Sequence, residues 1–115
     1  MSIERLHSGP RMSQAVIHGG IVYLAGQVGA PGETATAQTR AILASIDALL
    51  AEAGTDRSHL LTATIWLADM ADFAAMNVVW EEWIGGANAP TRATGEVRLA
   101  TPDYRVEIIV TAARS

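Results

Sequence analysis

The sequence predicts a single two-layer α+β domain, with two helices packed on one face of a mixed β-sheet. Two observations lead to this prediction. Several short stretches alternate apolar and polar residues, as half-buried strands do, whereas two longer stretches repeat apolar residues every three or four positions, as amphipathic helices do. The order along the chain is strand, strand, helix, strand, helix, strand, strand, without repeats or linkers. A chain of 115 residues can bury one core without disulfides or metals, so we expect residues 1–115 to form one domain.

The first part of the chain is expected to form the two strands with which this order begins. A further short strand is predicted ahead of them, over residues 3–8. Residues 13–18 and 21–25 predict a hairpin around Gly19-Gly20, because glycine readily adopts the positive φ of a tight turn. Residues 26–32 are rich in glycine and proline and predict a loop. This loop lacks the Gly-Lys-Ser/Thr ending of a phosphate-binding loop.

The first helix is the most regular element of the pattern. Thr34 or Thr36 can cap its start, and Gly54 lies where a helix commonly ends with glycine. Its apolar stripe consists of Ile42, Ile46, Leu49, Leu50 and Ala53. The polar residues off this stripe are expected on a solvated face: Gln38, Arg40 and Asp47.

A strand and a second helix follow. Residues 60–67 alternate, with an apolar set of Leu61, Ala63, Ile65 and Leu67. Asp69 is suited to cap the helix, whose stripe of Phe73, Met76, Trp80 and Trp83 is typical of a buried face. Glu81 and Glu82 are adjacent on the helix and do not face each other, so we interpret them as solvated charge. Residues 85–90 end the helix.

The last two strands carry the candidate chemistry. With a period of two, Arg92, Thr94, Glu96 and Arg98 share one face of the strand after Pro90. Thr101-Pro102-Asp103 predicts a turn, after which Glu107 lies on the polar side of a second strand. If the two strands pair, Arg92 and Glu107 approach a common pocket on a sheet face that the helices leave bare.

Two interpretations of this pair remain open. A guanidinium can hold a small carboxylate with two parallel hydrogen bonds, while a nearby carboxylate accepts a proton or orients a water molecule. Alternatively, Arg92 and Glu107 form a structural ion pair or face solvent, where such pairs contribute little.

The composition excludes several functions. The chain has no cysteine and no lysine, which excludes disulfides, a thiol nucleophile and a lysine Schiff base. A net charge of −4 argues against a protein that holds nucleic acid through its phosphates. His7, His18 and His59 are scattered and lack metal-ligand spacing.

Hydropathy and the N-terminus bear on assembly and location. The N-terminus lacks the apolar core of a signal peptide, and no apolar run approaches the length of a membrane span. We expect a cytoplasmic protein. Half of the residues are hydrophobic, which is high for a small soluble chain and indicates that some apolar surface is used in subunit contacts.

Several short motifs occur together along nearly the whole chain. They are Ser13-Gln14-Ala15-Val16, Ala25-Gly26-Gln27-Val28, Ala37-Gln38-Thr39-Arg40, Glu52-Ala53-Gly54, Leu67-Ala68-Asp69-Met70-Ala71-Asp72-Phe73-Ala74-Ala75-Met76-Asn77, Pro90-Thr91-Arg92 and Val106-Glu107-Ile108. In this order they resemble the reactive intermediate deaminase family, called RidA or YjgF. The amino-acid sequences of residues 63–69 and 77–83 resemble those of its YoaB branch.

The resemblance implies a chorismate-mutase-like fold assembled as a homotrimer, with a cleft between each pair of subunits. It places the carboxylate-binding arginine at Arg92, the conserved glutamate at Glu107, a backbone contact at Gly26 and the cleft asparagine at Asn77. A frequent cysteine of the family is Thr94 here, which makes Thr94 a further substrate-binding candidate.

Two further departures from the family pattern put the substrate range in doubt. The family's tyrosine after Gly-Pro is Arg11, and the serine of its Ser-Gly-Gln motif is Ala25.

The resemblance implies hydrolysis of 2-imino or enamine acids to 2-keto acids and ammonia, without a metal or organic cofactor. Arg92 would hold the carboxylate, while Glu107 and the backbone near Gly26 would position water. The alternative is a trimer that binds small carboxylates without turnover. A ribonuclease or translation inhibitor, an activity attributed to some relatives, is disfavoured by the acidic charge.

Overall fold

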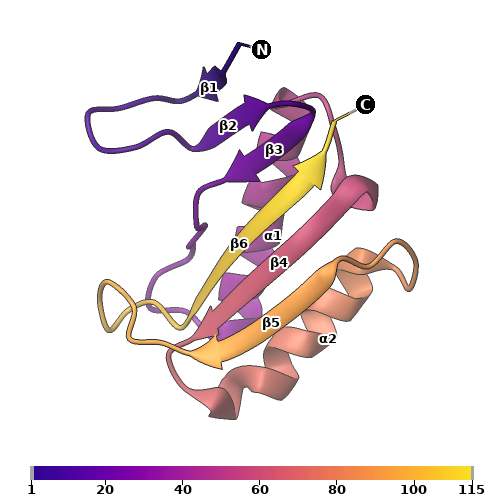
Figure 1. The fold of residues 1–115 in the computed structure, drawn as a ribbon. Helices are drawn as coiled ribbons and strands as arrows, with labels where there is room; N and C mark the ends of the chain where they lie inside the picture. Colours follow the sequence, from indigo (N-terminus) through magenta and orange to yellow (C-terminus); the bar gives the residue numbers. More distant parts are fainter. Residues whose placement is uncertain (1, 115) are drawn as a thin grey trace.

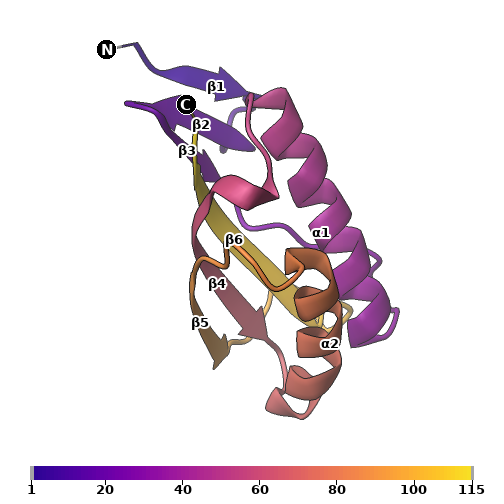
Figure 2. The same cartoon turned by 90° about the vertical axis from the view of Figure 1, so that its right-hand side faces the viewer.

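The computed structural model describes residues 2–114, which form one mixed sheet and two main helices. The strands are β1 (Glu4–Leu6), β2 (Ala15–His18), β3 (Ile21–Leu24), β4 (Leu60–Leu67), β5 (Thr91–Glu96) and β6 (Val106–Ala113), and the helices are α1 (Ala35–Glu52) and α2 (Phe73–Ile84). The sheet order is β1-β2-β3-β6-β4-β5, with β4 and β5 parallel and every other pair antiparallel. Both helices cover the same face (Figure 1 and Figure 2). The predicted α+β arrangement is confirmed.

The first hairpin forms where the glycine pair predicted it. His18 pairs with Ile21 across the turn, and Gly19 and Gly20 have φ values of 61° and 80°. Two successive positive φ values are typical of the turn in a two-residue hairpin, because the twist of this turn matches that of the flanking strands. Glycine reaches such φ values without steric cost.

Helix α1 begins and ends at the predicted signals. The Thr34 side chain accepts a hydrogen bond from the Ala37 amide at 3.1 Å, and Gly54 follows the helix with φ of 85°. The stripe residues Ile42, Ile46 and Leu50 are fully buried against the sheet. The core therefore lies between α1, α2 and the covered face of the sheet.

Gln38 corrects the predicted solvated face of α1, because its side chain is completely buried. Its amide nitrogen donates to the carbonyls of Glu33 and Asp103, both at 3.0 Å, and its oxygen accepts from the Arg105 amide at 2.8 Å. A primary amide carries both donors and an acceptor, so this one side chain satisfies three backbone groups. Gln38 ties the loop before α1 to the segment that enters β6.

The start of α2 differs from the prediction by one turn. Asp69 accepts from the Ala71 amide at 2.8 Å and caps a 3₁₀ turn, Met70–Asp72, which leads directly into α2. Within the aromatic stripe, Met76 and Trp80 are buried, but Phe73 is 38% exposed. Phe73 therefore corrects the prediction of a uniformly buried stripe, because it lies in the first turn, at the end of the layer.

Strand β4 keeps the predicted alternation after its first residues. Ala63, Ile65 and Leu67 are buried, whereas Leu61 is exposed because the pairing with β6 shifts register between Leu60 and Thr62. The extra residue of this irregularity turns Leu61 out of the alternating pattern.

Strands β5 and β6 do not pair, so the condition under which Arg92 and Glu107 would approach a common pocket is not met. β4 lies between them, parallel to β5 and antiparallel to β6 (Figure 1). The four inward-facing residues of β6 are fully or almost fully buried: Val106, Ile108, Val110 and Ala112. Such a strand stabilises the sheet most when it has neighbours on both sides, whereas the polar β5 suits an edge.

Arg92 lies on the helix-covered face of the sheet, which corrects its predicted place on the bare face. It pairs in register with Ala63, whose side chain is buried beneath the helices, and directly opposite residues share a face. The uncovered face instead carries Trp66, Glu107 and Ile109 in the centre of the sheet.

Neither α1 nor α2 is long and apolar enough to cross a membrane, and the same holds for the other helical turns within residues 2–114.

Candidate active site

The Arg92 guanidinium lies between the edge strand β5 and helix α2. Its central carbon lies 5.6 Å from the centre of the Trp80 ring and 5.9 Å from that of Phe73, within the range of a cation–π contact. Within residues 2–114 its nitrogen atoms make no hydrogen bond to the protein and no ion pair. A guanidinium has five N–H donors, so this one is held by aromatic rings while its donors stay available.

The surroundings of Arg92 favour an anionic ligand. Partial burial lowers the pKa of Arg92, whereas the nearby negative charge of Glu81 raises it. An arginine side chain nevertheless stays protonated at physiological pH. Its positive charge is therefore partly desolvated and lacks a direct carboxylate partner.

Two other predicted site residues lie on the same side of the molecule. Thr94 follows Arg92 on the same face of β5, and its hydroxyl oxygen is buried without a hydrogen-bond partner in the described chain. Asn77 is half-buried on α2, four residues after Phe73 and three before Trp80. This spacing places Asn77 on the helix face that carries both rings. The structure thus groups Arg92, Thr94 and Asn77 around one edge of the sheet.

Glu107 and Gly26 meet on the opposite face. Backbone hydrogen bonds join Gln27 and Ile108 in both directions, at 2.9 and 3.1 Å, and bring the neighbouring residues together. A Cβ atom at position 26 would collide with the Glu107 carboxylate unless that side chain shifted, so glycine permits this close approach. Burial raises the pKa of Glu107. The carboxyl group therefore retains its proton to a higher pH than a solvated glutamate does.

Arg92 and Glu107 do not form a pocket within one chain, contrary to the expectation based on strand pairing. Glu107 is opposite Trp66 on the bare face, whereas Arg92 is on the helix-covered face. The alternative of a structural ion pair is also wrong for the single chain, because neither residue takes part in the ion pairs of residues 2–114. A site that uses both residues needs two copies of the chain.

The two arginines that flank these strands have different surroundings. Arg105 forms an ion pair with Asp72, at 3.3 Å. Arg98 is exposed and lines a hollow of about 660 Å³ beyond the end of β5, together with Glu96, Leu99 and Tyr104. Arg92 differs from both in being held against aromatic rings with its donors unpaired.

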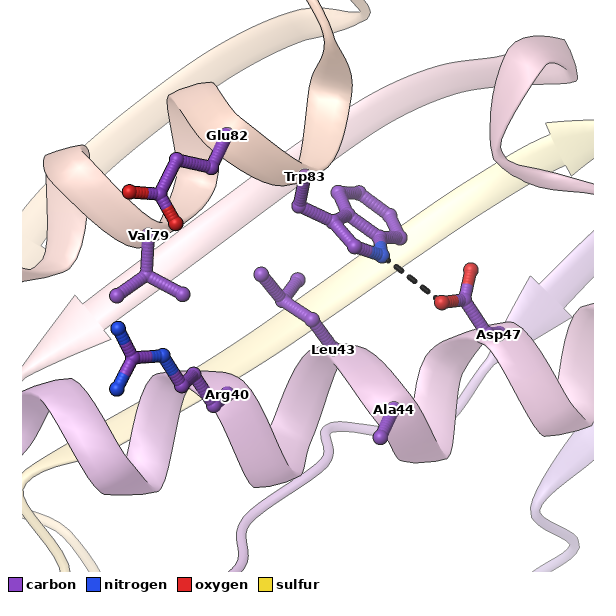
Figure 3. A pocket seen from close by; sticks show the side chains of 7 residues that line it. All are labelled: Arg40, Leu43, Ala44, Asp47, Val79, Glu82 and Trp83. Atoms are coloured by element: carbon purple, nitrogen blue, oxygen red, sulfur yellow. Dashed lines mark hydrogen bonds between the residues drawn. The ribbon is translucent and has the colours of Figure 1, made fainter.

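A groove of about 290 Å³ between α1 and α2 has structural contacts at one end (Figure 3). The Trp83 indole N–H donates to Asp47 at 3.0 Å, and Arg57 donates to both Asp47 and the Trp83 carbonyl at 2.8 Å. These contacts link the two helices. Asp47 is therefore not simply part of a solvated face, as its place off the apolar stripe had predicted.

The remaining sequence candidates occupy peripheral positions. Arg11 is exposed in the loop between β1 and β2. Ala25 is half-buried beside Gly26, and its amide donates to the Gln14 carbonyl at 2.9 Å. In the described part of the chain no three His, Asp or Glu side chains converge as a metal site.

Sequence reasoning missed three residues around Arg92. Phe73 and Trp80 were assigned to a core stripe and Glu81 to solvated charge, yet all three lie close enough to affect the guanidinium. Helical periodicity places residues on one face but does not identify the side chain that crosses from another strand.

Comparisons with known proteins identify the class to which this fold belongs. The profile of a family described as Endoribonuclease L-PSP matches residues 2–114. A RutC family protein from Haemophilus ducreyi is 46% identical over 112 residues, covering 96% of each chain. RutC family protein YoaB from Escherichia coli is 42% identical over 113 residues, covering 98% of this chain and 99% of its own.

Solved structures of similar fold include members of the same family. A member of the YjgF protein family from Neisseria meningitidis has a TM-score of 0.97 at 47% identity, covering 100% of this chain and 97% of its own. A putative endoribonuclease L-PSP from Entamoeba histolytica has a TM-score of 0.88 at 26% identity, covering 97% and 99%.

Fold and site together define a small α+β protein with a partly buried arginine held against aromatic rings at the edge of its sheet. The chain belongs to the YjgF/RidA family, and its similarity to YoaB confirms the branch that residues 63–69 and 77–83 indicated. The chorismate-mutase-like fold implied by the resemblance is likewise confirmed.

Proposed function

We propose that this protein hydrolyses reactive 2-imino and enamine acids to 2-keto acids and ammonia, in a cleft completed by a second copy of the chain. The observation that carries this proposal is the state of Arg92: it is partly desolvated, it is held against aromatic rings, and its donors have no protein partner within residues 2–114. Such a group is suited to bind a small carboxylate through two parallel hydrogen bonds. The family relationship supplies the reaction class.

The reaction follows from a carboxylate held by Arg92. Water adds to the imine carbon, so that a C–O bond forms, the C=N bond becomes single and the nitrogen takes up a proton. The resulting carbinolamine then forms the keto C=O, breaks its C–N bond and releases ammonia. An enamine enters this sequence after a proton shift to the imine.

Glu107 of a neighbouring copy is the group that we assign to the proton transfers. Burial raises its pKa toward the working pH, which improves a carboxyl group as a general acid and base. The Gly26 backbone beside Glu107 would position the water, while Thr94 and Asn77 would contact the substrate near Arg92. Since such imines are released by enzymes of amino-acid metabolism, we place the reaction in the cytoplasm.

A homotrimer accounts for two features of the chain. The sheet face opposite the helices is uncovered and carries Tyr23, which is 47% exposed, together with Trp66 and Ile109. Moreover, Arg92 and Glu107 lie on opposite faces, so contact between copies is the way to bring them into one cleft.

The second candidate is a trimer that binds small carboxylates without turnover. It uses the same Arg92 and is favoured by the family departures at Arg11, Ala25 and Thr94. A ribonuclease role, suggested by the names of some relatives, has less support because the chain is acidic and phosphate binding normally requires a basic surface.

Turnover of fresh imines separates these candidates. Several 2-imino acids would be generated in situ by an amino-acid oxidase, and the release of keto acid measured with wild type, Arg92→Ala and the matched control Arg98→Ala. We expect wild type and Arg98→Ala to accelerate hydrolysis and Arg92→Ala to lose this activity. Binding of pyruvate without acceleration by wild type would favour the binding protein, and salt-sensitive RNA binding would favour the ribonuclease.

A further inference from the structure

Arg92 lies against two aromatic rings and forms no ion pair with a carboxylate of residues 2–114, although the charge of Glu81 is nearby. Phe73 and Trp80 are seven residues apart on α2, which places them on one face of the helix, about two turns apart. A guanidinium whose central carbon lies within 6 Å of both ring centres therefore occupies the gap between them.

The kind of partner that an arginine contacts determines how many of its N–H donors remain available to a ligand. A carboxylate partner neutralises an arginine and uses its N–H donors, as Asp72 does for Arg105. An aromatic face attracts the cation without accepting these hydrogen bonds in the plane of the guanidinium.

A second arginine shows that the rings alone do not make a receptive site. Arg57 also lies over an aromatic ring, 5.0 Å from the centre of Trp83, but its donors are used by Asp47 and the Trp83 carbonyl. Arg57 is therefore a structural link, whereas Arg92 keeps its donors.

We propose that Phe73 and Trp80 are positioning residues for Arg92, with rings that fix the guanidinium plane so that its N–H edge faces a bound carboxylate. This inference rests on the proposed role of Arg92 as the carboxylate clamp.

Phe73 is the residue to test, because Trp80 is only 5% exposed and its replacement would disturb the core. Phe73→Leu keeps apolar volume but removes the ring, and Phe73→Tyr restores a ring. Val78→Leu is the matched control, since Val78 is an exposed apolar residue of the same helix, 57% exposed. Each variant would be titrated with pyruvate, and its kcat and KM measured for one imine.

We expect Phe73→Leu to bind pyruvate about three- to tenfold more weakly, the range that loss of one cation–π contact implies. Its kcat should fall as well, because a mobile guanidinium no longer aims the imine carbon. Phe73→Tyr and Val78→Leu should stay within about twofold of wild type on the same scale. In NMR spectra, the Arg92 Nε–Hε signal should move in Phe73→Leu alone, because this variant removes the ring current of Phe73 while that of Trp80 remains.

Different results would overturn different proposals. Unchanged affinity, kcat and NMR shift in Phe73→Leu would overturn the positioning role while leaving deamination intact. Equal damage in Phe73→Tyr and Phe73→Leu would also overturn it, since the ring would then not be what matters. Pyruvate binding that follows the expected series in a protein without imine turnover would overturn the proposed function and support the positioning of Arg92.

Discussion

At the scale of single residues, the chemistry depends on how each charge is solvated and paired. The Arg92 cation is partly buried and held by rings, and the Glu107 carboxyl is partly buried beside a glycine. Neither has an ion-pair partner within residues 2–114. Both residues therefore remain free to act on a ligand, and their variants test the function most directly.

Arg92→Lys should be nearly as damaging to turnover as Arg92→Ala, although it preserves the charge. A guanidinium is a planar fork that fixes both carboxylate oxygens, whereas an ammonium is a point charge on a flexible stem. Misplacement of a substrate by ~1 Å can cost on the order of a hundredfold in rate, so kcat should fall as well as affinity.

Steady-state imine hydrolysis by wild type and both Arg92 variants checks this prediction, with Tm measured on the same samples. A lysine variant with near-wild-type rates would contradict the clamp role of Arg92. Loss of folding in both variants would instead favour a structural role.

Glu107→Gln should lower turnover by on the order of a hundredfold or more, the usual contribution of a positioned acid or base. The stability of the folded variant at neutral pH, in contrast, should be no lower than that of wild type. Because burial raises the Glu107 pKa above its ordinary value of 4.5, the folded state binds more protons than the unfolded state between the two pKa values, and wild-type stability falls as pH rises through that range.

Glutamine removes this ionisation, so the variant should have a Tm at neutral pH no lower than that of wild type and a smaller decrease in Tm between pH 4 and 7. Thermal unfolding across this pH range and the pH dependence of kcat are the measurements. A Tm that rises with pH more steeply in wild type than in the variant would show that the raised pKa is wrong.

At the scale of elements, α2 and the loop before α1 position the candidate site. α2 supplies the rings and Asn77, and the bridge between Gln27 and Ile108 holds the segment beside Glu107. Gln38 joins the same loop to the segment that enters β6. The stability of these connections is therefore open to test without altering the site itself.

Gln38→Leu should lower the free energy of unfolding by roughly 2–4 kcal/mol, because it removes three part-buried hydrogen bonds to backbone groups. For a domain of this size the loss corresponds to a Tm lower by roughly 10 °C. Arg40→Leu is the matched control, on an exposed position of the same helix. Similar Tm values for the two variants would contradict the structural role of Gln38.

At the scale of the whole molecule, the sheet has one covered and one uncovered face (Figure 2). The two charged site residues lie on different faces. We expect a homotrimer, with a sedimentation mass near three times the 12.1 kDa of one chain. A mass near that of a single chain at micromolar concentration would overturn the proposed assembly and the shared cleft.

Ile109→Arg should dissociate this assembly and abolish imine turnover together, because it places an unpaired charge at the centre of the uncovered face. Val78→Arg, on the exposed surface of α2, is the matched control and should alter neither property. Sedimentation velocity and turnover of both variants check the prediction. An active Ile109→Arg monomer would show that one chain is sufficient.

Local patterns in the sequence determined the elements and their caps. The glycine pair at the hairpin, the Thr34 cap and the apolar stripe of α1 depend on neighbours within a few residues, and all three are found where predicted. The choice of Arg92 as the candidate clamp also came from a motif that is contiguous in the chain, and this role stays a prediction.

Only the tertiary structure decided which elements are neighbours and which face each side chain occupies. β4 separates β5 from β6, and Arg92 turns toward α2. The buried Gln38 side chain forms hydrogen bonds with the backbone of residues 33, 103 and 105. Local periodicity gives the two faces of a strand but does not say which face the helices cover. That choice depends on the apolar area buried when distant segments pack, so the surroundings of Arg92 and its separation from Glu107 follow from packing of the whole chain.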